Sequence, residues 1–320
     1  MNWLTNYLTS IPRPLQIGFG GLLALLIIGS VLAIILPRIK PGKWDDLKPR
    51  MKSWWVMCGL LIGALLLGWQ AFTILFTYIS YIALKEYLTL APTRREDRHV
   101  VLFAYLMVLV SYAAIWINNY MFFLLVIPVY VFIASAVMLT LTKRTDGFLA
   151  TAGILQWGLI VCVFNLGHVA FLMRTPAAEV PMAGAAGLVF FLIFVTQFND
   201  MAQYMWGKIF GKHKISPNIS PNKTWEGAIG GFVTTGILFV VLAPYFTPLT
   251  FWPSVWIGAT LPVLGFFGDI TMSAIKRDLG VKDTSLLIPG HGGALDRLDS
   301  LMFTAPWYFH MLAYFALERF

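Results

Sequence analysis

The sequence predicts an all-α, polytopic integral membrane protein with about ten transmembrane helices. Hydrophobic residues make up 58% of the 320 residues, and charged residues only 12%. Apolar runs long enough to cross a bilayer, about 17–25 residues, recur along the whole chain. The polar segments between them fall well short of the size of a soluble domain, so we expect a single membrane domain.

The apolar runs follow one another with short polar connections. We expect membrane spans near 17–37, 54–68, 71–89, 99–117, 119–141, 149–172, 182–198, 225–247, 252–271 and 300–318. The run at 54–68 is short, and residues 68–70 join it directly to the next run, so we interpret the two as a tight helical hairpin. Gly227 and Gly231 have the spacing that lets two membrane helices approach closely.

Basic residues are distributed unevenly over the predicted connections. With the N-terminus outside, the inward-facing side carries 20 of the 23 lysines and arginines, namely Lys85 and those in 38–53, 90–98, 142–148, 199–224 and 273–299. The outward side carries only Arg13, Arg174 and Arg319. Because basic residues favour the cytoplasmic side, we expect an outward N-terminus and cytoplasmic connections in the plasma (inner) membrane. The net charge of +8 then indicates lipid headgroups or nucleotides, and no nucleic acid, as partners.

The chain divides into a less specified start and a longer multi-helix part. We expect residues 1–53 to form an N-terminal transmembrane helix, rather than a cleaved signal peptide, followed by a basic cytoplasmic loop. Residues 54–320 would form the multi-helix membrane domain, with its chemistry concentrated in 196–300. Cys58 and Cys162 lie inside apolar runs, so we expect neither a disulfide nor a metal site from them.

Polar chemistry is concentrated near the C-terminus, between Ser273 and Ser300. Carboxylates in this stretch are hard oxygen ligands for a divalent cation, and its lysines and arginines can bind phosphate oxygens. Gly290, Gly292 and Gly293 would allow backbone N–H groups to converge on an anion. The stretch therefore predicts a site for a metal–polyphosphate complex at the membrane edge.

Three carboxylates are candidates for the metal. Asp269 ends an apolar run, where a carboxylate is costly unless it is paired or metal-bound, and pairing with Lys276 is the alternative. Asp296 and Asp299 are three residues apart, so both lie on one face of a helix. Capping of the last span is the alternative for this pair. For His291 the open roles are phosphate partner, general acid and turn residue.

Two motifs resemble those of the phosphatidate cytidylyltransferase (CDP-diacylglycerol synthase) family. The first reads S-x-x-K-R-x4-K-D and then P-G-H-G-G-x-x-D-R-x-D, and every specified position is matched between Ser273 and Asp299. The second, Ser220 to Gly227, resembles the family's S-P-[KR]-K-T-x-E-G element. Met272 stands where the family has a glutamate. The chain is therefore identified as a divergent, bacterial-type member.

The resemblance implies transfer of a cytidylyl group from CTP to phosphatidate, which gives CDP-diacylglycerol and pyrophosphate, by a cytidylyltransferase-like domain over 54–320. The implied catalytic residues are Asp269, Lys276, Arg277, Lys282, Asp283, His291, Asp296 and Arg297. The implied phosphate-binding residues are Ser220, Lys223, Thr224, Gly290, Gly292 and Gly293. Asp269, Asp296 and Asp299 would hold Mg²⁺, with a second, monovalent cation left open.

Other functions remain open at this point. The chain could activate another lipid phosphate with CTP, or phosphorylate a lipid such as a polyprenol. A catalytically weak paralogue with a regulatory role and a ten-span transporter are further alternatives. Transporters place charges near the bilayer midplane, whereas the acidic residues here cluster at the inner boundary. A homodimer is also left open.

Overall fold

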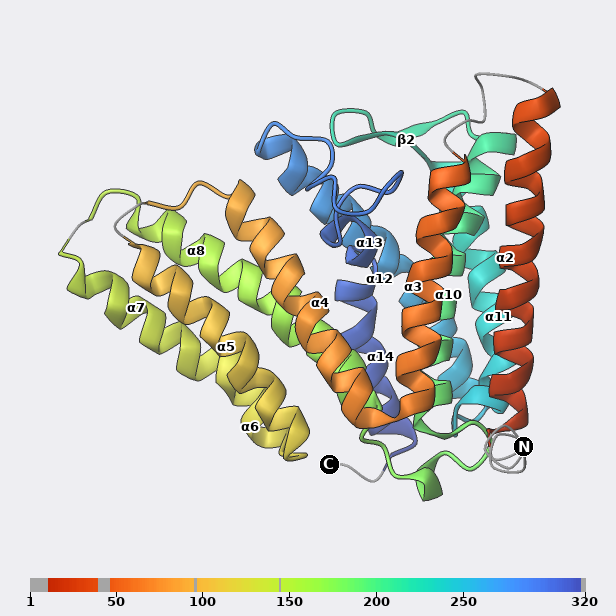
Figure 1. The fold of residues 1–320 in the computed structure, drawn as a ribbon, viewed down its shortest axis with the longest axis horizontal. Coiled ribbons are helices and arrows are strands. Elements are labelled where there is room, and N and C mark those ends of the chain that lie inside the picture. Colours follow the sequence, from red (N-terminus) through yellow and green to blue (C-terminus); the bar gives the residue numbers. More distant parts are fainter. Residues whose placement is uncertain (1–10, 40–46, 95–96, 144, 318–320) are drawn as a thin grey trace.

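A computed structural model describes residues 11–39, 47–94, 97–143 and 145–317. Within these residues the helices run side by side between two ends of the molecule (Figure 1). The long helices are α2 (Arg13–Ile39), α3 (Leu47–Leu67), α4 (Trp69–Leu90), α5 (Arg98–Trp116), α10 (Gly184–Phe210), α11 (Trp225–Phe246) and α12 (Phe251–Asp278). The shorter ones are α6 (Tyr120–Leu125), α7 (Phe132–Leu141), α8 (Phe148–Leu159), α9 (Leu166–Leu172), η4 (Ala177–Glu179), α13 (Leu295–Leu298) and α14 (Leu301–Phe315).

Ten helical segments of the described chain run from one end to the other, as the sequence predicts. The π-helical segment η2 (Val126–Val131) joins α6 to α7, and η3 (Ile160–Asn165) joins α8 to α9, so each trio makes one crossing. Eight of the ten are long and apolar enough to span a membrane, and the other two are α4 and α14. The chain is an integral membrane protein.

Several helices extend beyond the predicted spans. α10 continues to Phe210 and α12 to Asp278, and α3 already begins at Leu47, inside the predicted inward loop. Hydropathy marks only the part of a helix that contacts lipid, whereas the backbone hydrogen bonds continue into the polar region. Five basic residues of the charge argument, Lys40, Lys43, Arg95, Arg144 and Arg319, lie outside the described residues.

A two-stranded antiparallel hairpin is an addition to the all-α prediction. β1 (Lys214–Ser216) pairs with β2 (Ser220–Thr224) in the segment between α10 and α11. Thr224 ends the hairpin and is the N-cap of α11, because its side chain accepts a hydrogen bond from the Gly227 backbone N–H over 3.2 Å. The hairpin is therefore fixed directly to the start of a membrane helix.

α10 and α11 approach closely at two glycines. A Cβ atom at Gly227 would lie 2.8 Å from the Gln203 carbonyl oxygen, and one at Gly231 would lie 2.3 Å from Gln203 Cγ. Both positions therefore exclude a side chain, as the glycine spacing predicts for a close helix pair. This contact places the polar C-terminal turns of α10 against the hairpin.

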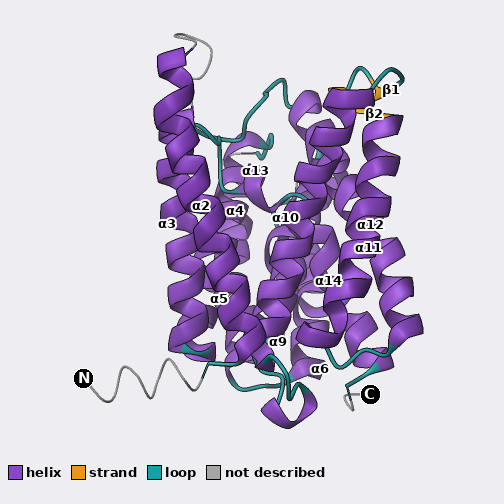
Figure 2. Cartoon of the chain, turned by 90° about the vertical axis from the view of Figure 1, so that its right-hand side faces the viewer, coloured by secondary structure: helices purple, strands orange, loops and turns teal. Residues whose placement is uncertain are grey.

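The polar connections gather at one end of the molecule, which we call the polar end. It carries the hairpin, the C-terminal end of α12, the connection 279–294 and α13 (Figures 1 and 2). The first turns of α3 and the last turns of α4 lie at the same end. α2 begins and α14 ends at the opposite end, as expected for ten crossings.

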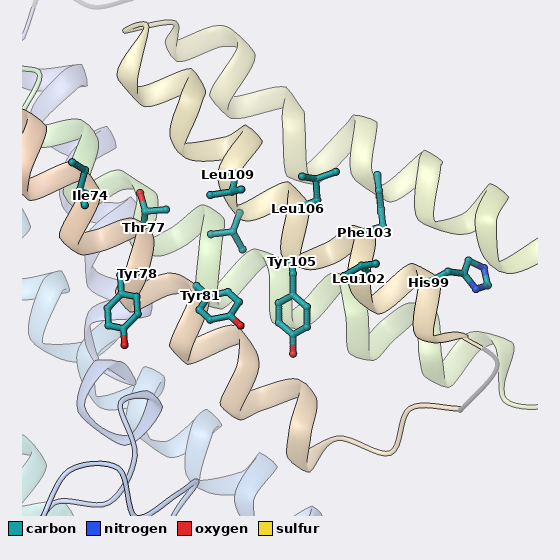
Figure 3. A pocket seen from close by; sticks show the side chains of 11 residues that line it. Ile74, Thr77, Tyr78, Tyr81, His99, Leu102, Phe103, Tyr105, Leu106 and Leu109 are labelled. Carbon is teal, nitrogen blue, oxygen red and sulfur yellow. The ribbon is translucent and has the colours of Figure 1, made fainter.

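A lipid-facing groove of about 890 Å³ lies between α4 and α5. Figure 3 shows its lining, with Tyr78, Tyr81 and Tyr105 pointing to one side. The complete lining is Ile74, Thr77, Tyr78, Tyr81, His99, Leu102, Phe103, Tyr105, Leu106, Val108 and Leu109. Among the described residues this lining is mostly aliphatic and aromatic, with His99 at one end.

Candidate active site

Two polar cavities open at the polar end, one beside the hairpin and one beside the segment that follows α12. The hairpin cavity has a volume of about 570 Å³ and is lined by Asp200, Gln203, Tyr204, Gly207, Lys208, Lys214, Ser220, Asn222, Lys223, Thr224, Gly227, Ala228, Phe266 and Asp269. The loop cavity has a volume of about 670 Å³ and is lined by Arg50, Trp54, Lys282, Asp283, Leu286, Ile288, Pro289, Gly290, His291, Gly292 and Arg297. Together they contain most of the site residues expected from the sequence.

The hairpin cavity brings the motif Ser220 to Gly227 together with Asp269 of α12. Lys223 Nζ lies 2.7 Å from Asp269 Oδ2, so β2 and α12 are joined by an ion pair. Ser220 lines the same cavity. Thr224 also lines it, but its hydroxyl oxygen caps α11 and is buried. Lys223 is therefore the positively charged residue of this motif in the cavity lining, and it is already paired with Asp269.

Three carboxylates form a cluster where α10, α12 and the start of α14 meet: Asp200, Asp269 and Asp299. Ser300 Oγ donates to both oxygens of Asp200, over 3.1 and 3.0 Å. α12 packs so tightly here that a Cβ atom at Gly268 would lie 2.6 Å from the Asp299 carbonyl oxygen. Burial, and then the charges of Asp269 and Asp200, raise the pKa of Asp299 well above its ordinary value. Mutual repulsion of this kind favours a bound cation.

The donor chemistry of this carboxylate cluster fits Mg²⁺ without a preformed cage. Among the described residues, no three His, Cys, Asp or Glu side chains converge closely enough to hold an ion by themselves. Mg²⁺ in nucleotide enzymes is usually held by one or two carboxylates, with waters and substrate phosphates completing its coordination. Asp269 and Asp299 supply such carboxylates beside a cavity that also offers Lys223.

The carboxylate of Asp296 has different hydrogen-bond partners from the three carboxylates of the cluster. Its Oδ1 accepts a hydrogen bond from Lys276 Nζ over 2.8 Å. Its Oδ2 accepts hydrogen bonds from the Thr284 N–H over 2.8 Å and from the Gly293 N–H over 2.9 Å. It also lies 3.0 Å from the Thr284 hydroxyl, whose one proton is shared between Asp296 and Glu86. Burial opposes ionisation, but these hydrogen bonds prevail and lower the pKa of Asp296. The ionised carboxylate thus organises the segment 279–295, which we call the signature loop. The predicted role of Asp296 as a metal ligand stays a prediction.

Glu86 on α4 is a site residue that the sequence analysis missed. Its buried carboxylate accepts hydrogen bonds from both ends of the signature loop. The donors are the Thr284 hydroxyl at 3.1 Å, the Ser285 hydroxyl at 2.6 Å, the Ala294 N–H at 3.1 Å and the Leu295 N–H at 2.9 Å. The signal was available, because Glu86 is an acidic residue at the end of an apolar run, as Asp269 is.

The glycines of the signature loop are required by close packing as well as by backbone conformation. Gly292 has a φ of 81°, in the left-handed region. A Cβ atom at Gly293 would lie 2.1 Å from Thr284 Oγ1 and 2.5 Å from Glu86 Oε2. The Gly293 N–H already donates a hydrogen bond to Asp296 Oδ2. Its expected role in binding phosphate therefore competes with a structural one.

Of the remaining predicted residues, four line the loop cavity, and Arg277 lies outside both linings. Arg277 donates from Nε to the Ile219 carbonyl over 3.3 Å and from Nη1 to the Val281 carbonyl over 3.1 Å, so it ties α12 to the hairpin. Lys282, Asp283, His291 and Arg297 line the loop cavity. The positive charge of Arg297 also acts on His291 in the loop cavity and on Asp200 in the lining of the hairpin cavity. Met272, at the departure from the family pattern, is buried in the apolar core.

Known proteins resemble this chain over most of its length. Residues 48–315 match the model of the Cytidylyltransferase family. The uncharacterized protein YnbB of Escherichia coli K12 is 40% identical over 298 residues, which cover 92% of this chain and 96% of that protein. A phosphatidate cytidylyltransferase of Staphylococcus saprophyticus is 30% identical over 256 residues, 77% of this chain and 90% of its own. The protein of the same name from Staphylococcus aureus COL is 43% identical over 122 residues, 37% of this chain and 46% of its own.

Proposed function

This chain belongs to the cytidylyltransferase family, and we propose that its substrates are CTP and phosphatidate. The products would be CDP-diacylglycerol and pyrophosphate. Two findings support phosphatidate as the acceptor. The relatives from Staphylococcus saprophyticus and Staphylococcus aureus carry the name of that activity, and the polar end offers two cavities, one for each of two anionic substrates.

The reaction requires little acid–base chemistry. An oxygen of the lipid phosphate attacks the α-phosphorus of CTP and forms a new P–O bond. The bond from that phosphorus to the oxygen bridging to the β-phosphate breaks, and pyrophosphate leaves with the bridging oxygen. Because the lipid phosphate is already an anion, no strong base is needed. Catalysis then consists of aligning two polyanions and neutralising the charge on the leaving group.

The hairpin cavity is the better site for the triphosphate. Lys223, Lys208 and Lys214 line it and can bind phosphate oxygens, while Asp269 borders it. Mg²⁺ held by the carboxylates would neutralise charge on the triphosphate and on the pyrophosphate. Geometry favours Asp269 and Asp299 for this role. Asp296, the third residue expected from the sequence, is surrounded by protein donors instead.

Arg297 is the residue best placed to act on both substrates. It lines the loop cavity and lies within electrostatic range of Asp200 in the hairpin cavity. A guanidinium group keeps its charge and can bridge two phosphate groups through its fork of N–H donors. Arg297 would thus hold the two reacting phosphates together. The single observation that carries the proposal is the presence of two polar cavities with cationic linings at the same end of the molecule.

We place the polar end in the cytoplasm, where CTP is found. The support is the sequence-based excess of basic residues on that side. Both cavities, with their carboxylates and lysines, then open to the cytoplasm at the inner face of the plasma membrane. Phosphatidate could present its headgroup there without leaving the bilayer.

The acceptor can be identified by mass spectrometry. Purified protein would be incubated with CTP, Mg²⁺ and, in separate reactions, dioleoyl phosphatidate, lysophosphatidate, a polyprenyl phosphate and a polyprenol. We expect CDP-diacylglycerol from phosphatidate as the dominant product. A CDP-lipid formed only with another phosphate would refute the acceptor assignment. If no lipid gives a product while the Staphylococcus saprophyticus relative is active in parallel, the proposed activity is wrong.

A further inference from the structure

The loop cavity is built jointly by the signature loop and by α3, which lies outside both sequence motifs. Ser53 Oγ donates to the Pro289 carbonyl oxygen over 2.8 Å. The rings of Trp54 and His291 meet edge to face, with their centroids 5.9 Å apart. A Cβ atom at Gly290 would lie 2.9 Å from Arg50 Cγ. α3 therefore forms a fixed wall of this cavity.

The lining of the loop cavity suits a phosphate group. Arg50, Lys282 and Arg297 contribute three positive charges, and Asp283 contributes one negative charge. His291 also lines the cavity, and its Nδ1 is buried without a hydrogen-bond partner in the described part of the chain. An anion with several oxygen atoms can accept hydrogen bonds from the guanidinium and ammonium groups here.

The edge of the same cavity is apolar and exposed. Leu286, a lining residue, is 92% exposed, and the adjacent Leu287 is 55% exposed. Trp55 on α3 is 40% exposed, and tryptophan is enriched at the membrane–water interface. Exposed leucines at the end of a membrane-spanning bundle are suited to contact with acyl chains.

We propose that the loop cavity binds the phosphate monoester headgroup of the lipid substrate, with Arg50 as a substrate-binding residue and Leu286 and Leu287 against the acyl chains. This inference rests on the proposed function and deepens it, because it assigns the two substrates to different cavities. A free nucleotide or inorganic phosphate would gain nothing from the exposed leucines, whereas an amphiphile uses both the charges and the apolar rim. Arg297 then lies where the two substrates meet.

Equilibrium binding without turnover tests this assignment. Purified full-length protein in detergent would be titrated by microscale thermophoresis with dioctanoyl phosphatidate, with CTP and with inorganic phosphate, each separately. Arg50→Gln should weaken phosphatidate binding by about tenfold or more, because one charge-assisted contact is lost. CTP binding should change less than twofold. Lys52 is an exposed residue of the same helix and is not part of the cavity lining. Lys52→Gln should therefore leave the affinities for phosphatidate and for CTP unchanged.

A second variant separates a lipid from a free anion. Leu286→Ser with Leu287→Ser should weaken dioctanoyl phosphatidate binding severalfold and leave inorganic phosphate binding unaltered. Equal affinity for phosphatidate and inorganic phosphate, with no effect of the leucine changes, would make this a free-phosphate site and overturn the inference. Loss of CTP binding in Arg50→Gln, with phosphatidate binding retained, would overturn it as well.

Synthesis and binding, measured on the same variants, distinguish the binding site from the proposed activity. Normal CDP-diacylglycerol synthesis by a protein whose Arg50→Gln variant binds phosphatidate normally would refute the inference alone. Phosphatidate binding that depends on Arg50, in a protein that makes no CDP-diacylglycerol, would refute the proposed function and leave the binding site in place.

Discussion

The carboxylate of Glu86 on α4 accepts a hydrogen bond from the hydroxyl of Thr284 in the signature loop over 3.1 Å. The same hydroxyl lies 3.0 Å from Asp296 Oδ2. A residue outside both family-like motifs is thus joined, through one threonine, to a carboxylate inside them. The position of the loop, and of the cavity that it lines, depends on this connection.

Glu86→Gln should lower turnover by at least tenfold. A carboxylate can accept all four hydrogen bonds from the loop, whereas a carboxamide has one accepting oxygen and turns an N–H₂ group toward donors. Hydrogen bonds to charged groups contribute about 1.5–3 kcal/mol each, so the loss of even one or two displaces the loop. Steady-state turnover and the thermal unfolding midpoint would be measured together. Lys85→Gln, at the exposed neighbouring position, is the control, and equal activity of both variants would contradict the role of Glu86.

Asp269→Asn and Asp299→Asn should raise the Mg²⁺ concentration needed for half-maximal activity, on the order of 10–100-fold. Each change removes a negative oxygen from the carboxylate cluster beside the hairpin cavity. Asp296→Asn should strongly lower turnover and also lower stability, because its donors Lys276, Thr284 and Gly293 lose an ionised partner. A titration of the variant's activity against Mg²⁺ concentration shows whether Asp296 is a metal ligand or supports the loop. An unchanged Mg²⁺ requirement in any residual activity would show that Asp296 supports the loop and is not a ligand.

His291 should make the protein less stable as the pH falls below about 6.5. Burial, and then the charges of Arg297 and Arg50, lower the pKa of His291 from its ordinary value of 6.5. The unfolded chain therefore takes up a proton before the folded protein does. The stability that the neutral imidazole contributes is complete above pH 6.5 and is lost as the pH falls through the lowered pKa.

The unfolding midpoint at pH 7.5, 6.5 and 5.5 checks this dependence. The wild-type midpoint should fall more steeply between pH 6.5 and 5.5 than that of His291→Gln, which has no titrating ring. His99→Gln, at an exposed position on α5, should follow the wild type. Parallel curves for wild type and His291→Gln would contradict the prediction.

Single cysteines should report opposite sides of the membrane. In a background lacking Cys58 and Cys162, Asn218→Cys in the hairpin turn should resist an impermeant thiol reagent in intact cells and react after lysis. Ala178→Cys, in the connection between α9 and α10 at the other end, should react in intact cells. Both positions are exposed. The reverse pattern would place the polar end outside and leave the site without access to CTP.

The crossings of this fold are predictable from the sequence, but the helix ends are less so. Apolar length alone gave ten segments in the right order. It missed the final turns of α10 and α12, since residues such as Lys208 and Arg277 continue a helix in water as well as in lipid. The hairpin is held by the capping of α11 by Thr224 and by strand pairing, neither of which changes hydropathy.

The site was predictable where its residues are close in the chain. The motif between Ser273 and Asp299 supplied most of the residues of the loop cavity and one of the three clustered carboxylates, Asp299. A second carboxylate, Asp269, was found from its place at the end of an apolar run. Glu86 and Arg50 act across contacts with residues some 200 positions away, and local spacing holds no information about which helices meet. For the same reason the sequence grouped Asp296 with Asp269, whereas the hydrogen bonds of Asp296 connect it to the loop.

The position of the label in the lipid product tests cytidylyl transfer most directly. Purified protein, phosphatidate and Mg²⁺ would be incubated with CTP labelled at the α-phosphate or, in a matched reaction, at the γ-phosphate. The account predicts that α-label enters the lipid, that γ-label leaves as pyrophosphate, and that Asp269→Asn suppresses both. Entry of γ-label into the lipid would show phosphorylation by CTP, and would contradict cytidylyl transfer.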